Sequence, residues 1–158
     1  ISDLHSSKTA YHSLFESHLM YGLLVWGGTS NANLEKALIQ QKRAIRCLAG
    51  IRVQDSCREA YKQLKILTVT SLYIREAILH VVSNPQTRNE DLHQHDTRHA
   101  SNFALPIHRL TLYEKKPSYK GALFFNKLPD NIKNAPARNL KKTLTTWLQD
   151  RPYYTEKR

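Results

Sequence analysis

The chain has 158 residues, of which 41% are hydrophobic and 23% charged, and 24 Lys and Arg against 13 Asp and Glu give a net charge of +11. This length and composition exclude a disordered chain, and two cysteines are too few for a disulfide framework. The excess of positive charge favours a polyanionic partner, either nucleic acid or an acidic membrane surface, and composition alone leaves both open.

The start of the chain predicts a piece of a longer protein, because it begins at Ile1 and its only methionine is Met20. The polar residues 2–12 lack the basic start and the apolar centre of a signal peptide. The longest apolar stretch, residues 19–26, is much shorter than the roughly 20 residues that a membrane-spanning helix needs. We therefore expect no membrane partner.

Apolar residues at three- and four-residue spacing predict an amphipathic helix from about residue 7 to residue 26, which the glycines at 27–28 would end. A second helix is expected from about residue 33 to residue 49, with Ser30 or Asn33 as its cap and Gly50 as its stop. The glycines would allow a sharp reversal, so that the first, apolar helix supports the second, basic one.

Two further helices are expected in the first half of the chain. Ser56 and Glu59 have the spacing of a capping box for a short helix over residues 57–64. Ser71 is a candidate cap for a helix over residues 72–82, whose small polar face predicts a central position.

The second half begins with residues 83–102, which have almost no apolar content and predict an exposed loop. Residues 103–113 alternate in polarity and contain Pro106, so we expect extended chain or an edge strand there. Helices are predicted over residues 118–128 and 138–150.

These elements predict a mainly α protein with three parts. The first is a helical bundle over residues 1–83, and the second is a polar loop or linker over residues 84–102. The third is a smaller basic C-terminal segment over residues 103–158, with an extended stretch and two helices.

Candidate catalytic groups are scarce. The adjacent acids Glu90–Asp91 lie in the polar loop without apolar flanks to fix them, so we expect no metal site and no catalytic residue. His93, His95 and His99 could ligate zinc, although no cysteine or apolar wall supports them. A metal-dependent nuclease or hydrolase built on this histidine loop is therefore the alternative function.

Basic residues carry more information because they cluster: residues 33–65 hold eight Lys or Arg against three acids, and residues 97–158 hold thirteen against four. The first candidate set lies on or between neighbouring helices and comprises Lys42, Arg43, Arg46, Arg52, Arg58, Lys62 and Lys65. The second set interleaves cations with an aromatic ring and comprises Arg98, Arg109, Lys115, Lys116, Tyr119 and Lys120. Such sets favour phosphate contacts and base stacking. The alternative is a charged surface that only keeps the protein soluble.

Several short motifs follow one another along nearly the whole chain, from about Lys8 to Tyr154. They are Tyr21-Gly22 with Trp26-Gly27, Gln41-Lys42-Arg43 with Ile45-Arg46, Ser56-Cys57-Arg58, Leu67 before Leu72-Tyr73, Thr97-Arg98, and Asn126-Lys127-Leu128-Pro129. Together and in this order they resemble the region downstream of the polymerase domain in reverse transcriptases of non-LTR retrotransposons, particularly jockey-like elements.

The resemblance implies a thumb-like bundle that helps an upstream palm and fingers domain to grip an RNA template and a DNA primer or target. In that family the paired aspartates that hold Mg²⁺ belong to the upstream domain, and this chain has no such motif. No catalytic residue carries over, so we expect the chain to be inactive alone and to hold no cofactor of its own.

Two departures from the family pattern stand out. Asp96 occupies a position where asparagine is expected, and a terminal Cys-Cys-His-Cys zinc knuckle is missing. The resemblance further implies an intracellular protein, in the nucleus and cytoplasm as part of a retrotransposon ribonucleoprotein. A remnant of a decayed element without activity is a further alternative.

Overall fold

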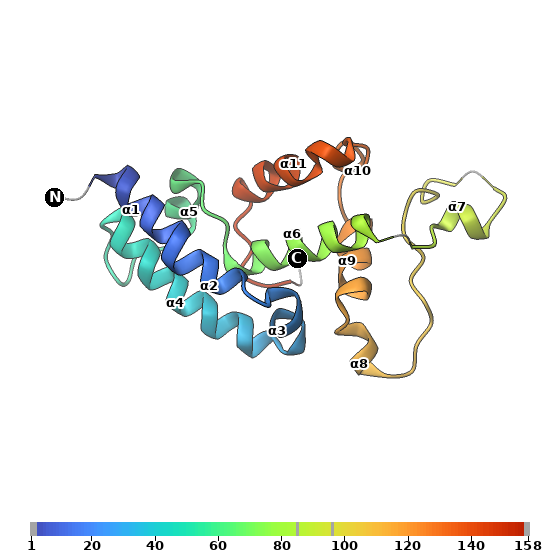
Figure 1. The fold of residues 1–158 in the computed structure, drawn as a ribbon, viewed down its shortest axis with the longest axis horizontal. Coiled ribbons are helices and arrows are strands. Elements are labelled where there is room, and N and C mark those ends of the chain that lie inside the picture. Colours follow the sequence, from blue (N-terminus) through green and yellow to red (C-terminus); the bar gives the residue numbers. More distant parts are fainter. Residues whose placement is uncertain (1–2, 85, 96, 157–158) are drawn as a thin grey trace. The chain divides into compact units, whose positions relative to one another are not determined.

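Helices dominate the computed structural model of the chain, which describes residues 3–84, 86–95 and 97–156 (Figure 1). Helix accounts for 66% of the protein. Within the described residues no strand forms, and an isolated antiparallel bridge pairs Arg88 with Phe103. The predicted mainly α fold is confirmed.

The helices group into two compact units. The first unit contains the described residues up to Tyr73 and those from Thr146 onward, and the second contains Ile74–Thr145. The predicted division at residues 84–102 followed polarity along the sequence, whereas these units follow contacts in space. The main difference is that the end of the described chain belongs to the first unit.

The first unit begins with short helical segments, namely α1 (Leu4–Ala10), the π-helical η1 (Tyr11–Glu16), α2 (Ser17–Met20) and α3 (Leu23–Thr29). The prediction that Gly27 and Gly28 end the first helix is wrong. The chain breaks at Gly22 instead, where φ is 65°, a left-handed value that glycine adopts without strain. Gly27 and Gly28 are buried inside α3, and a Cβ on Gly27 would lie 2.8 Å from the ring of Tyr73.

The long helix α4 (Asn31–Ala49) begins slightly before the predicted residue 33, with Ser30 rather than Asn33 as its cap, and ends at Gly50 as predicted. The Ser30 hydroxyl accepts a hydrogen bond from the Asn33 N–H at 3.4 Å, and Gly50 leaves the helix with φ of 65°. Figure 1 shows α4 running alongside α1, η1 and α2. These first helical segments therefore do support the basic helix α4.

Helix α5 (Arg58–Leu64) follows, and the predicted capping box before it does not form. The Ser56 hydroxyl accepts from the Arg58 N–H at 3.4 Å, but Glu59 pairs with the Lys62 ammonium at 3.5 Å. Lys65 ends the helix in the left-handed region with φ of 53°.

Helix α6 (Val69–Ser83) starts earlier than predicted, because Thr68 rather than Ser71 caps it. The Thr68 hydroxyl accepts from the Ser71 N–H at 3.0 Å, while Ser71 itself is fully buried. Val69–Tyr73 belong to the first unit and the rest of the helix to the second. Most side chains of α6 are buried, as its small polar face predicts.

The second unit contains α7 (Asn89–Leu92), α8 (Thr111–Glu114), α9 (Pro117–Asn126), α10 (Asp130–Lys133) and most of α11 (Ala137–Gln149). The helices predicted over residues 118–128 and 138–150 are confirmed as α9 and α11. Helix α9 crosses α6 at Gly121, where a Cβ would overlap the Ala77 carbonyl and the Val81 side chain (Figure 1).

Of the two alternatives predicted over residues 103–113, no edge strand forms: residues 104–110 are chain without regular secondary structure, and α8 begins at Thr111. The Asn126 side chain bonds both backbone groups of Phe103, accepting from its N–H at 2.9 Å and donating to its carbonyl at 3.0 Å. These bonds use the groups that a sheet ladder would need, and Pro106 supplies no N–H a few residues later.

No single helix in the described part of the chain is long and apolar enough to cross a membrane. Helices α5 and α6 together reach the required length and composition, but they are bent by 56° at the residues between them.

The side-chain amide of Gln41 lies in the core of the first unit and has no exposed surface. Its nitrogen donates to the Tyr11 hydroxyl at 2.8 Å and to the Leu67 carbonyl at 2.9 Å. Its oxygen accepts from the Tyr61 hydroxyl at 3.0 Å and from the Val69 N–H at 2.8 Å. Burial raises the pKa of both tyrosines well above the usual value, so they stay neutral.

Replacing the Gln41 amide should destabilise the first unit strongly. In Gln41→Leu the four groups that it bonds lose their partner in the core, and we expect the free energy of unfolding to fall by roughly 3 kcal/mol or more. The exposed neighbour gives a matched control, because Gln40→Leu should change it by less than about 0.5 kcal/mol. Equal losses in the two variants, measured by urea unfolding, would contradict this account.

Candidate nucleic-acid interface

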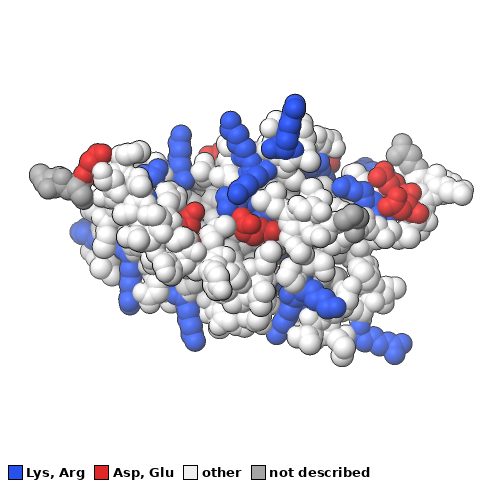
Figure 2. Space-filling view, viewed as in Figure 1, with Lys and Arg blue, Asp and Glu red and all other residues white. Residues whose placement is uncertain are grey.

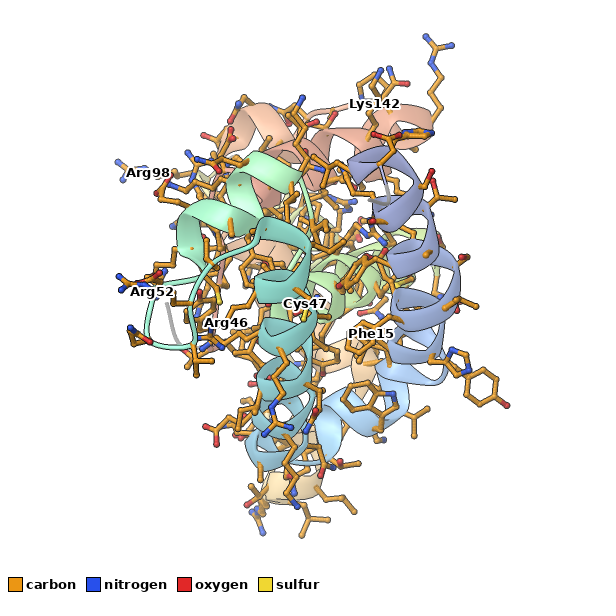
Figure 3. All side chains as sticks on the ribbon, turned by 90° about the vertical axis from the view of Figure 1, so that its left-hand side faces the viewer. Phe15, Arg46, Cys47, Arg52, Arg98 and Lys142 are labelled. Atoms are coloured by element: carbon orange, nitrogen blue, oxygen red, sulfur yellow. The ribbon has the colours of Figure 1, made fainter. Side chains whose placement is uncertain are left out.

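Three of the predicted cations, Lys42, Arg43 and Arg46, lie on α4. Arg43 is exposed, while Lys42 and Arg46 are half-buried. A groove of about 670 Å³ beside them is lined by Ile39, Lys42, Arg43, Arg46, Cys47, Ile51 and Val53. Figure 3 shows Arg46 pointing from α4 toward the loop that carries Arg52.

Two of the predicted cations meet on one aromatic ring. The Lys42 ammonium lies 4.0 Å from the centroid of the Tyr154 ring, and the Arg58 guanidinium lies 4.3 Å from it. The Arg58 guanidinium also donates to the Pro152 carbonyl at 3.2 Å. Burial raises the pKa of Tyr154, so the ring stays neutral and offers the cations its electron-rich face.

A pocket of about 380 Å³ opens next to this ring. Its lining residues are Arg58, Glu59, Lys62, Asp150, Arg151, Pro152, Tyr153, Tyr154 and Thr155. The Arg151 guanidinium lies 4.9 Å from the Trp147 ring and donates to the Trp147 carbonyl at 3.3 Å. Arg58 and Arg151 are therefore both held by a ring and a backbone carbonyl, which lowers the entropy cost of binding an anion.

The remaining cations of the first set are partly engaged. Arg52 pairs with the Asp55 carboxylate at 3.3 Å, and Arg46 donates to the Asp55 carbonyl at 3.4 Å. Lys65 is exposed at the end of α5. The structure thus brings three predicted cations into the groove and Arg58 with Lys62 into the pocket, whereas Arg52 and Lys65 line neither.

In the second unit the structure brings predicted cations to a separate group of rings. Lys116 lies 4.6 Å from the Tyr113 ring, and Tyr119 meets the His108 ring edge-on at 4.9 Å. Lys120 lies 6.0 Å from the Phe124 ring. The other predicted cations are exposed on loops or at a helix end, namely Arg98, Arg109 and Lys115.

Positive charge by itself does not single out a site. Figure 2 shows Lys and Arg side chains projecting in several directions, while Asp and Glu gather in fewer places. The rings that orient particular cations therefore distinguish the candidate interface from the rest of the basic surface.

Sequence reasoning missed several residues that the structure places around cations. Tyr153 and Tyr154 follow Arg151 closely in the sequence, which is the same mixture of cations and rings that selected Tyr119. That signal would have found them. No such mixture of cations and rings in the sequence marked Arg88. Its guanidinium lies 4.5 Å from the Phe103 ring.

The histidine loop has no metal-site geometry in the part of the chain that the structure describes. His93, His95 and His99 are exposed, and Asp96 lies outside the described residues. Among the described residues, no group of three or more His, Cys, Asp or Glu side chains is arranged to hold a metal ion.

No protein-family model, curated protein or solved structure with which the chain was compared matches it. The resemblance to non-LTR reverse transcriptases stays a prediction that rests on the motifs quoted above.

His108 gives the second ring group a dependence on pH. Its Nε2 lies 2.9 Å from the Glu114 carboxylate, and its ring stacks on Tyr113 with centroids 5.3 Å apart. The hydrogen bond with Glu114, and secondarily one with the Pro106 carbonyl, raises the pKa of His108 above its ordinary value. Only the protonated ring can donate to both the Glu114 carboxylate and the Pro106 carbonyl, so the two bonds coexist below the raised pKa and one of them is lost as the pH rises through it.

The substitution Glu114→Gln should lower the pKa of His108 toward its ordinary value, because it removes the charged acceptor. The imidazole proton signals in an NMR titration measure this directly. Asp130→Asn, which removes a carboxylate on α10, should leave the His108 titration unchanged. An unchanged His108 midpoint in Glu114→Gln would show that the ion pair does not hold the proton.

Proposed function

We propose that the chain binds nucleic acid, an RNA template with a DNA primer or target, as a non-catalytic part of a non-LTR retrotransposon reverse transcriptase. The observation that carries the proposal is the Tyr154 ring with the Lys42 ammonium and the Arg58 guanidinium on it, beside a pocket lined by Lys62 and Arg151. The motif resemblance supplies the polymerase part of the proposal.

The chemistry of this site supports nucleic acid over other polyanions. Guanidinium groups bind phosphate through paired N–H donors, and Arg58 and Arg151 are already oriented by rings. Tyr153 lines the same pocket and can stack on bases or sugars. A solubilising surface needs neither oriented guanidiniums nor rings next to them.

In this proposal the chain holds the nucleic acid while an upstream palm and fingers domain performs catalysis with Mg²⁺. The chain itself supplies no catalytic residue, so supplied with template, primer, nucleotides and Mg²⁺ it should incorporate no nucleotide. The corresponding location is a ribonucleoprotein in the cytoplasm and nucleus.

Salt titrations test the phosphate contacts. Because each neutralised phosphate releases condensed counterions, Arg58→Ala should reduce the slope of log affinity against log salt by about 0.9 on an RNA–DNA hybrid. This substitution should weaken the binding of different sequences equally, because phosphate contacts carry no base information.

Lys36→Ala is the matched control, because Lys36 is exposed on α4 and lines neither the groove nor the pocket. Its salt slope should equal that of the parent chain. If Arg58→Ala behaves like Lys36→Ala, the cations around Tyr154 form only a solubilising surface and the proposal fails.

A pair of substitutions at Tyr154 separates the ring from its hydroxyl. The Tyr154 hydroxyl oxygen is buried without a hydrogen-bond partner, so Tyr154→Phe should keep both affinity and stability. Tyr154→Leu removes the ring on which Lys42 and Arg58 lie, and we expect roughly tenfold weaker binding of an RNA–DNA hybrid by fluorescence anisotropy. Equal affinity of Tyr154→Leu and Tyr154→Phe would show that the Tyr154 ring does not contribute to binding.

A further inference from the structure

The groove on α4 differs in chemistry from the pocket at Tyr154. Its apolar lining is formed by Ile39, Cys47, Ile51 and Val53, and Ile39 and Val53 are 52% and 81% exposed. Its volume is about 670 Å³. Aliphatic surface gathered in an open groove of this size is typical of an interaction site.

The polar groups of the groove are all cationic. Lys42, Arg43 and Arg46 line it, and neither an acidic side chain nor an aromatic ring does. Arg46 donates to the Asp55 carbonyl at 3.4 Å through a terminal nitrogen, and its side chain also lines the groove. The groove therefore calls for a ligand that combines aliphatic groups with negative charge.

Nucleic acid supplies the negative charge that this groove calls for, but not the aliphatic groups. Phosphates pair with the cations, but bases bind best to aromatic rings; the groove has none in its lining, whereas Tyr153 and Tyr154 line the other pocket. A helix with aliphatic side chains on one face and carboxylates along its edges supplies both, because carboxylates pair with guanidinium groups bidentately.

We propose that this groove docks an amphipathic, acidic helix of a partner protein. The aliphatic face of that helix packs against Ile39, Ile51 and Val53, and its Asp or Glu side chains pair with Arg43 and Arg46. The site goes beyond the proposed nucleic-acid interface and depends on different residues, except that Lys42 lines the groove and also lies on Tyr154.

The experiment uses a synthetic peptide of about 20 residues, long enough to form a helix in isolation, with leucines on one face and glutamates along both edges. Fluorescence anisotropy measures its binding to the full chain. The exposed thiol of Cys47 reports the place of binding, since Cys57 is only 2% exposed. We expect saturating peptide to slow the reaction of Cys47 with a small thiol reagent at least tenfold.

Two variants keep the test specific. Val53→Asp places a charge in the groove at an exposed position, so the chain should fold and the peptide should bind about tenfold more weakly. Val25→Asp is the matched control, because Val25 is 72% exposed on α3 outside the groove, and it should bind as the parent does. A peptide of the same composition with its leucines spread around the helix should not bind, which separates docking from simple charge attraction.

Three results would overturn the proposal. They are equal affinity for the two peptides, equal affinity of Val53→Asp and the parent chain, and protection of Cys47 by an RNA–DNA hybrid instead of the acidic peptide. Neither variant alters the Tyr154 pocket, so hybrid binding by Val53→Asp should match the parent. Failure of the docking site and failure of the nucleic-acid interface are therefore distinguishable.

Discussion

The side-chain amide of Gln41 joins segments of the first unit that are far apart in the sequence. The Leu67 carbonyl can only accept a hydrogen bond and the Val69 N–H can only donate one, so these two backbone groups fix which way the amide points. The Tyr11 hydroxyl accepts the other hydrogen bond that the amide nitrogen donates, and the Tyr61 hydroxyl donates the other one that the amide oxygen accepts. An amide saturated in this way favours one arrangement of η1, α4, α5 and the start of α6 over all others.

This constraint also sets the rotation of α4 about its own axis. Successive residues on a helix differ by about 100°, so once Gln41 points into the core, Lys42 and Arg43 must point elsewhere. Lys42 reaches the Tyr154 ring, and Arg43 reaches the exposed groove. The motif Gln41-Lys42-Arg43 therefore combines one structural anchor with two cations whose directions that anchor determines.

The sequence predicts what depends on local signals and misses what depends on distant contacts. Both ends of α4 were predictable because Ser30 and Gly50 act within one helical turn. The choice of Gly22 over Gly27 as the turn was not, because Tyr73, from a distant part of the sequence, packs on Gly27. Cations of the candidate interface were predictable from composition. The role of Tyr154 was not assigned, because it arises only when residues after 146 return to the first unit.

That return has a consequence for the order in which the protein assembles during synthesis. The Tyr153 carbonyl accepts from the Thr68 hydroxyl at 2.6 Å, and the Gln149 amide donates to the Lys65 carbonyl at 3.0 Å. These partners are translated after the whole of Ile74–Thr145. The second unit therefore emerges from the ribosome before the residues that close the first. Synthesis of the first unit begins before that of the second unit and ends after it. The Tyr154 pocket therefore forms only after the second unit has left the exit tunnel.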